Sequence, residues 1–273
     1  MATKDHQSEP IESASETLQR IFDGHGSVLG SQMADESSRY DVLKKTDFPK
    51  PQRTRRIAVA NQKGGVGKTT STVNTAAALA NKGAQVLVID MDPQGNASTA
   101  LGVSHASGEP SVYDVIEGRS DLGDVITVCP DFPTLDVVPA SIDLSGAELE
   151  VADLPNRNTL LKEALDLYLR QSDKHYDYVF IDCPPSLGLL VINAMCAVTE
   201  MLIPIQAEYY ALEGLGQLIN TIGLVQEHFN PVLLVSTMLV TMFDRRTLLS
   251  REVYNEVKGP VSYTHLTLPT TPY

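Results

Sequence analysis

The sequence predicts an α/β fold, a mostly parallel, twisted sheet with helices on both faces. One observation is that short, continuous apolar runs alternate with helix-like stretches from Ile57 onward. Runs of this kind are typical of strands that are buried on both faces. A second is that glycines and polar residues directly follow several of these runs, at the carboxyl ends of strands, where ligands bind in such sheets.

The elements follow in order along the chain. Strands are expected at 57–60, 86–89, 135–138, 178–181, 201–205 and 233–237. Helices are expected between or after them at 71–82, 143–151, 159–170, 189–197, 213–228 and 247–257. Continuous apolar strands separated by helices indicate a parallel sheet covered on both faces.

Composition limits the class of protein. The chain has 273 residues and is 42% hydrophobic, which suffices for one large α/β domain and a tail. We expect no transmembrane segment and no secretion signal, because no apolar run has the required length. Cys129, Cys183 and Cys196 lack metal-ligand spacing and are interpreted as thiols in a reducing cytoplasm. The net charge of -13 argues against a generally basic, nucleic-acid-coating protein but allows a local basic patch.

The N-terminal segment differs in composition from the rest. Residues 1–52 are rich in serine and acidic residues, and we predict a mostly disordered tail. Residues 11–22 could form a short amphipathic helix for a partner, although an unstructured tail is favoured. Arg53, Arg55 and Arg56 form a basic cluster before the first strand, which is either a site or a solvated edge.

The most specific pattern is Q-K-G-G-V-G-K-T-T at 62–70, between the first strand and the first helix. Strand, glycine loop and helix form the context of a phosphate-binding loop, in which backbone N–H groups and the helix dipole face an anion. Lys68 can contact β- and γ-phosphates and the Thr69 hydroxyl can bind Mg²⁺. The ordinary pattern has glycine where this chain has Gln62, and a second lysine, Lys63, follows it.

Acidic residues follow two of the predicted strands. Asp90 and Asp92 come after the second strand, and Asp182 follows a later apolar run. Asp182 fits the Walker B arrangement, in which a strand-end carboxylate holds Mg²⁺ directly or through water. Asp92, in a proline-fixed turn, is the candidate for positioning the attacking water. A single aspartate of this kind is more often a helix N-cap, but the combination with the glycine loop favours a magnesium site of Thr69, Asp92 and Asp182.

The stretch from Arg56 to about Gly259 resembles the ParA-type partition ATPases, within the ParA/MinD branch of deviant Walker A P-loop NTPases. The matching stretches are 60–70, 90–96, 180–186 and 204–214. The glycine loop is highly specific for this branch. The stretch 204–214, together with 241–247, favours the chromosomal, Soj-like type.

The resemblance implies roles for residues. Lys63 would reach across an ATP-sandwiched homodimer to the partner's nucleotide, where a cation acts as an arginine finger does, an effect of about 10³ to 10⁵ in rate. Lys63, Lys68 and Asp92 would be catalytic, and Thr70 would lie near the α-phosphate. The nucleotide site as a whole would comprise Gly64, Gly65, Val66, Gly67, Lys68, Thr69, Thr70, Asp182 and Gln206.

The resemblance also implies a function. The expected protein is a cytoplasmic, nucleoid-associated DNA-segregation ATPase that hydrolyses ATP with Mg²⁺. Its ATP-bound dimer would bind DNA without sequence preference, and a ParB-like centromere-binding protein would stimulate hydrolysis and release. Non-specific DNA binding needs basic residues, and the candidates are Arg245, Arg246 and Arg251, whose alternative interpretation is a solvated helix face.

Other functions stay open. A MinD-like ATPase acting on a membrane surface needs a C-terminal amphipathic helix. An electron-transfer ATPase like the nitrogenase iron protein needs paired cluster cysteines, which the three cysteines do not match. A nucleotide-gated adaptor could position a protein cargo instead. The sequence does not choose between chromosome, plasmid and other cargo.

Residues 261–273 do not continue the alternating pattern and are rich in proline and threonine. The family would carry a further strand, a Pro-Arg-Asn type loop and a final helix here. We interpret the segment as a non-native tail resembling a translated sequencing-library transposon adapter, with a divergent natural tail as the alternative. On this interpretation the domain at 53–260 lacks its C-terminal strand and helix, and we expect poor ATP hydrolysis and aggregation.

Overall fold

The computed structural model describes residues 37–42, 45–46, 48–208, 211–244, 246–258 and 265–269. It divides into two units, Met1–Pro49 and Lys50–Tyr273. In the first unit, residues 37–42 are helical and exposed, within the segment expected to be disordered. The helix expected at 11–22 lies outside the described residues.

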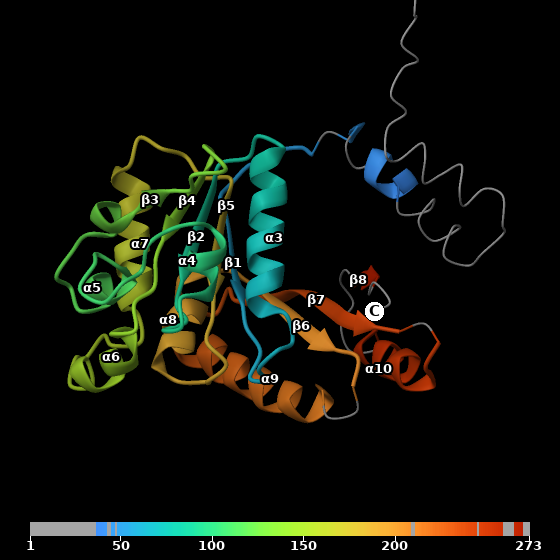
Figure 1. Ribbon diagram of the computed structural model, residues 1–273. Helices are drawn as coiled ribbons and strands as arrows, with labels where there is room; N and C mark the ends of the chain where they lie inside the picture. Colours follow the sequence, from blue (N-terminus) through green and yellow to red (C-terminus); the bar gives the residue numbers. More distant parts are fainter. Residues whose placement is uncertain are drawn as a thin grey trace, which may run out of the picture. The chain divides into compact units, whose positions relative to one another are not determined.

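The second unit contains an eight-stranded sheet in its described part, with strand order β3-β4-β2-β5-β1-β6-β7-β8 (Figure 1). All neighbouring strands are parallel except the β3–β4 pair. The predicted α/β class with a mostly parallel sheet is therefore confirmed. The strands are β1 (Arg55–Val59), β2 (Val86–Asp90), β3 (Thr127–Val128), β4 (Leu135–Val138), β5 (Tyr178–Asp182), β6 (Glu200–Gln206), β7 (Leu234–Phe243) and β8 (His265–Pro269).

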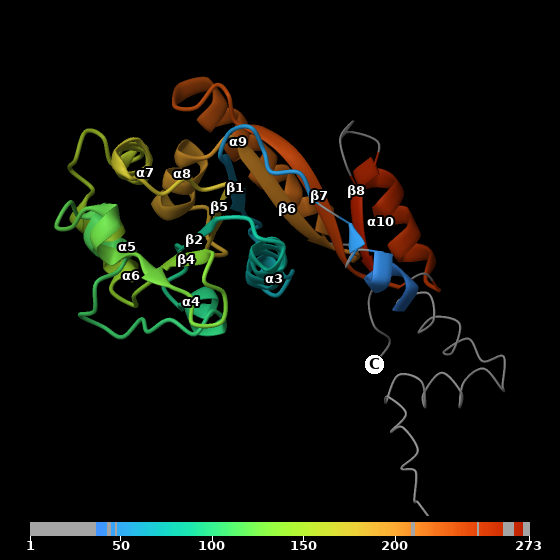
Figure 2. The ribbon, with the colours of Figure 1, turned by 90° about the horizontal axis from the view of Figure 1, so that it is seen from above.

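Helices cover both faces of this sheet. Figure 2 shows α3 and α4 on one side and α7, α8 and α9 on the other. Among the described residues, no helix is both long and apolar enough to cross a membrane. The helices are α3 (Lys68–Asn81), α4 (Asn96–Ala100), α5 (Val112–Ile116), the 3-10 turn η1 (Leu122–Val125), α6 (Leu144–Glu150), α7 (Leu160–Gln171), α8 (Leu189–Ala197), α9 (Ala211–His228) and α10 (Leu248–Lys258).

The central strand β1 shows why its sequence is apolar throughout. Ile57 and Val59 belong to the apolar cluster beneath α3, whereas Ala58 belongs to the cluster on the opposite face. Successive side chains of a strand point to opposite faces, so a strand covered on both sides must be apolar at every position. On α3 the small side chains of Ala76 and Ala80, one turn apart, are buried in the first of these clusters.

The sheet edge beyond β7 differs from the expectation. No strand was expected within 261–273, yet His265–Pro269 pairs in parallel with β7, matching Met238 with His265 and Val240 with Thr267. The physical reason is the edge of β7, whose unpaired N–H and C=O groups accept a further strand. The segment alternates Leu with His, Thr and Pro, which fits a strand despite its proline and threonine content.

Candidate phosphate-binding site

The glycines set the conformation of the loop between β1 and α3. Gly65 (φ 75°) and Gly67 (φ 91°) adopt the left-handed conformation that other residues enter only at an energetic cost. Val66 between them is buried and anchors the loop to the core. Gly67 is the N-cap of α3, whose 14 residues point the positive end of their dipole at the loop. Gly64 and Gly65 are exposed at its mouth.

Lys68 lies inside this loop. Its side chain is almost completely buried, and its Nζ donates to the Lys63 carbonyl at 3.3 Å. Burial lowers the pKa of the Lys68 ammonium, and the neighbouring Asp182 and Asp92 carboxylates partly offset this effect. A buried ammonium whose hydrogen bond to a carbonyl is long is suited to an anion such as a phosphate.

Asp182, at the end of β5, contacts the first turn of α3. Its Oδ2 accepts from Thr69 Oγ1 at 2.7 Å and its Oδ1 accepts from Thr72 Oγ1 at 3.0 Å. The carboxyl is fully buried, and this burial raises its pKa to about 7, with smaller contributions from Asp90 and Asp92. A desolvated carboxyl beside a hydroxyl is a suitable environment for Mg²⁺, because oxygen ligands and a neutralising charge are what the cation and the carboxylate require.

Asp90 and Asp92 follow β2, next to β5. Asp90 is buried, and its Oδ2 accepts from the Ser98 N–H at 2.8 Å and the Ser98 hydroxyl at 2.7 Å. Its Oδ1 accepts from the Asp92 N–H at 3.2 Å. Asp92 accepts the Gln94 N–H at 3.0 Å, which closes a turn on its own side chain. Asp90 therefore acts as an internal acceptor that fixes the segment carrying Asp92.

Unlike Lys68, Lys63 extends out of the loop toward Glu208. Its Nζ pairs with Glu208 Oε2 at 2.6 Å, where the side chains are 35% and 50% exposed. Gln206, at the end of β6, donates to the other Glu208 oxygen, so it lies beside the Lys63–Glu208 pair. The Lys63 N–H donates to Asn61 Oδ1 at 3.0 Å, and the Asn61 amide donates to the Pro204 carbonyl at 2.7 Å. The front of the loop is thereby tied to β6.

Thr70 and two of the predicted DNA-contacting arginines, Arg246 and Arg251, are exposed. Thr70 lies on the first turn of α3, where its carbonyl accepts from the Asn74 amide at 2.8 Å. Arg246 forms an ion pair with Asp244 at 2.8 Å, and this arginine lowers the pKa of Asp244 to about 2. Arg251 is exposed on α10, whereas Arg245 lies outside the described residues. A DNA phosphate would have to compete with Asp244 for Arg246.

Several site residues carried no role in the sequence interpretation. Thr72 is one turn beyond Lys68, so helical spacing could have placed it beside Asp182. Glu208 lies in a recognised stretch, but its ion pair with Lys63 joins residues far apart in the sequence. Thr241 Oγ1 donates to the Val66 carbonyl at 2.9 Å, and its own carbonyl accepts from the Ala207 N–H at 3.1 Å. No local pattern indicates such a contact.

Comparison with known proteins gives the family. The family described as AAA domain matches residues 54–235. The sporulation initiation inhibitor protein Soj of Bacillus subtilis is 50% identical over 202 residues, 74% of this chain and 78% of the relative. The chromosome partitioning protein ParA of Caulobacter vibrioides is 46% identical over 203 residues, 74% and 75% of the two chains. The chromosome-partitioning ATPase Soj of Thermus thermophilus is 45% identical over 207 residues, 76% and 77%.

Solved structures share the fold. Cobyrinic acid a,c-diamide synthase from Mycobacterium smegmatis, with bound ADP and magnesium, aligns with a TM-score of 0.71 and 39% identity, covering 79% of this chain and 86% of that one. A putative plasmid partition protein from Borrelia burgdorferi, bound to AMPPNP, aligns with a TM-score of 0.68 at 24% identity, covering 81% and 88%, and supports the fold alone.

The two kinds of comparison agree on the architecture, and the sequence relatives narrow the group. Two of these relatives are named for chromosome partitioning, and all three are 45% to 50% identical over about three quarters of this chain. The chain therefore belongs to the AAA domain family and, within it, to the Soj/ParA group of chromosome-partitioning ATPases.

Proposed function

We propose that this protein is an ATP-dependent DNA-segregation ATPase whose two loop lysines serve two different nucleotides. The observation that carries the proposal is their divergence. Lys68 is buried inside the loop, whereas Lys63, five residues earlier, extends out of it to Glu208. A lysine at the front of a phosphate loop that faces away from the loop's interior is suited to a nucleotide bound by another subunit.

The residues of one subunit fit ATP and Mg²⁺. The loop from Gly64 to Gly67 and the start of α3 offer N–H groups to phosphates, and Lys68 supplies a buried positive charge. Thr69 would bind Mg²⁺, with Asp182 holding it directly or through water. Bound Mg²⁺ would neutralise charge on the phosphates. Asp92 would orient the water that attacks the terminal phosphate.

Dimerisation on ATP would bring Lys63 to the partner's nucleotide. The Lys63–Glu208 pair is half exposed, and pairs of this kind contribute about 0 to 1 kcal/mol. Exchanging Glu208 for a phosphate therefore costs the subunit little. A cation supplied in trans typically accelerates phosphoryl transfer by about 10³ to 10⁵.

DNA would be the surface that the protein binds and leaves during this ATPase cycle. The ATP-bound dimer would bind DNA without sequence preference through Arg246 and Arg251 near the sheet edge, and Arg245 is the third candidate. The acidic net charge of -13 makes such binding depend on a local patch and on salt. A ParB-like protein would stimulate hydrolysis and so release the dimer from the nucleoid, which moves cargo within the cytoplasm. The names of the relatives support this proposal.

The test measures mass in solution and binding to random-sequence DNA with ATP, with ADP and without nucleotide, at several salt concentrations. Wild-type protein should dimerise and bind DNA only with ATP. Lys63→Ala should still bind ATP but should remain monomeric, and Asp92→Ala should dimerise and stay on DNA. Lys82→Ala, at the opposite end of α3, is the matched control and should behave as wild type.

Three results would overturn the proposal: DNA binding that needs no ATP, no DNA binding under any condition, or dimers of Lys63→Ala as stable as those of wild type. ATP-dependent binding to anionic lipid vesicles in place of DNA would favour the MinD-like alternative.

A further inference from the structure

A loop that the nucleotide site does not include lies against the turn that carries Asp92. We call residues 104–109 the strap and residues 92–95 the Asp92 turn. The centre of the strap is His105. A Cβ atom built on Gly95 would lie 2.4 Å from His105 Nδ1 and 2.6 Å from His105 Cε1. The imidazole therefore lies directly against the Gly95 Cα, and no larger residue fits beneath it.

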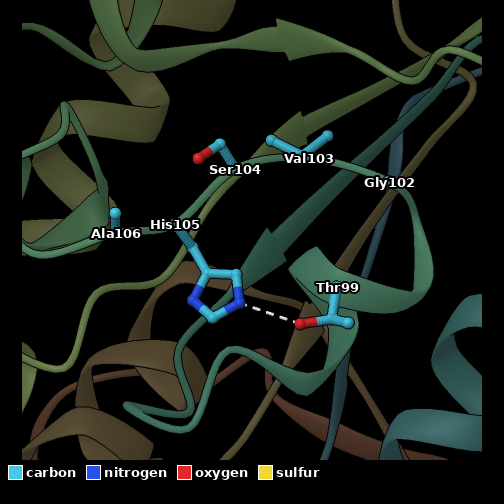
Figure 3. Close-up of a pocket in the computed structure, with 6 residues that line it drawn as sticks. All are labelled: Thr99, Gly102, Val103, Ser104, His105 and Ala106. Carbon is cyan, nitrogen blue, oxygen red and sulfur yellow. Dashed lines mark hydrogen bonds between the residues drawn. The ribbon is translucent and has the colours of Figure 1, made fainter.

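A hydrogen bond fixes the orientation of this ring. His105 Nε2 and Thr99 Oγ1 are 2.8 Å apart, as the dashed line in Figure 3 shows. The Thr99 N–H donates to the Gly95 carbonyl at 2.9 Å, which forms the first turn of α4. The ring thus bridges the end of the Asp92 turn and the helix that follows it.

Internal hydrogen bonds fix the shape of the strap, and a further one attaches it to Asp143 at the start of α6. The Glu109 carboxylate accepts from Ser104 Oγ at 2.5 Å and from the Ala106 N–H at 3.2 Å. The Asp143 carboxylate accepts from Ser107 Oγ at 3.0 Å. These bonds hold the backbone on both sides of His105, so the ring has a defined place from which to press on Gly95.

Solvent reaches this contact from outside. A cavity of about 470 Å³ adjoins the strap, and His105 is half-buried there. The histidine is therefore no ordinary core residue, and the Thr99 hydrogen bond rather than enclosure keeps the ring in place. The residues that line the cavity, labelled in Figure 3, are Thr99, Gly102, Val103, Ser104, His105 and Ala106.

On its inner side the Asp92 turn is held by Asp90, which accepts the Asp92 N–H and both Ser98 donors. The Gly95 N–H donates to the Asp92 carbonyl at 2.9 Å, so a shift of Gly95 moves Asp92. Asp90 thus accepts the N–H of the turn's first residue, and His105 lies against its last residue. The turn is clamped between a buried carboxylate and a half-buried imidazole.

We infer that His105 is a positioning residue for Asp92, acting through Gly95 and held by Thr99. The inference rests on the proposed role of Asp92 in orienting water. Loss of the clamp should lower the rate of hydrolysis and leave nucleotide binding intact, because the glycine loop and Lys68 lie on other elements. Misplacement of a catalytic group by about 1 Å can cost roughly 10²-fold in rate.

The experiment compares kcat and the KM for ATP in the full chain with Mg²⁺. His105→Ala should lower kcat about tenfold while KM stays within about twofold of wild type. Thr99→Val removes the hydroxyl at nearly constant shape and should lower kcat about threefold, whereas Thr99→Ser keeps the hydroxyl and should match wild type. His105→Gln, whose amide nitrogen can replace Nε2, should recover most of the rate lost in His105→Ala.

A kcat of His105→Ala equal to wild type would overturn the inference, as would equal kcat values for Thr99→Val and Thr99→Ser. A purely structural role would lower the thermal stability and the active fraction of all four variants. It would not produce a difference in kcat between Thr99→Val and Thr99→Ser at constant KM. Asp92→Ala in the same assay distinguishes failure of the proposed role of Asp92 from failure of the proposed role of His105. If Asp92→Ala hydrolyses ATP as wild type does, the proposed role of Asp92 fails. If it is inactive while His105→Ala is normal, the clamp alone fails.

Discussion

The phosphate loop and the far sheet edge, from the end of β7 to α10, are built in opposite ways. At the loop, Lys68 and Asp182 are buried and their environment is complete in the free protein. At the far edge, Arg246 and Asp244 are exposed and neutralise each other. Met242, on β7 close to Asp244, has a φ of 53° and is exposed. One region is organised before its ligand arrives, and the other presents groups that a partner must rearrange.

Two aspartates, one in each region, show how the two environments differ. Burial raises the pKa of Asp182 to about 7, whereas the exposed Asp244 has its pKa lowered to about 2 by Arg246. Desolvation dominates in the first environment and hydrogen bonding to a cation in the second. A cation beside Asp182 would offset the cost of desolvating its carboxylate, whereas Asp244 already has the Arg246 guanidinium beside it.

The largest effect is expected at the phosphate loop, where a buried charge is removed. Lys68→Ala should weaken ATP binding by about 100-fold or more, because a charge-assisted contact of about 3 kcal/mol is lost from a desolvated site. Fluorescence titration with a labelled ATP analogue measures the affinity, and Lys82→Ala is the control. Tight binding by Lys68→Ala would contradict the assignment of the loop.

Next is the pH dependence of Asp182 in the metal-free protein. Its pKa in the folded protein is about 7, above the ordinary value of 3.8, so the folded state binds this proton more tightly than the unfolded state. The resulting contribution to stability is fully present when the pH is below the ordinary pKa. This contribution is lost as the pH rises from about 4 to about 7. Asp182→Asn should therefore be more stable than wild type at pH 8 and should gain much less at pH 4. Thermal unfolding at both pH values measures the difference, and an equal gain at both would exclude the mechanism.

A smaller effect should come from a hydrogen bond that joins the two regions. Thr241 on β7 donates to the Val66 carbonyl within the loop. Thr241→Val should lower the free energy of unfolding by about 1 kcal/mol, because a buried carbonyl loses its donor. Urea denaturation measures this, and Thr241→Ser should retain the bond. A loss of the same size in the serine variant would point to packing rather than to the hydrogen bond.

The smallest effect should appear at the exposed edge. Asp244→Asn releases Arg246 from its ion pair and should raise DNA affinity a few-fold, since exposed pairs are worth about 0 to 1 kcal/mol. Arg246→Ala should lower affinity and reduce the salt slope by about 1. DNA binding across a salt series measures both. If neither variant changes affinity, Arg246 takes no part in DNA binding.

Local sequence was sufficient where a strand is a continuous apolar run or a helix is long enough to show its period. The apolar run at 86–89 and the stretch at 159–170 became β2 and α7 within a residue or two. The elements that went unpredicted, α4, α5, η1 and β3, span two to five residues, too few to establish a period. β8 was missed because its pairing depends on the free edge of β7 and not on its own composition.

The sequence by itself determined the parallel sheet, the glycine loop and the presence of Lys68, Thr69, Asp92 and Asp182 at one edge, because carboxyl ends of parallel strands meet there. Only the tertiary structure decided which partners these groups have. Lys63 faces Glu208, Thr241 holds Val66 and His105 covers Gly95, all through contacts between segments with no shared local pattern. Packing sets such contacts, since a side chain's neighbours depend on how whole elements stack and not on its place in the chain.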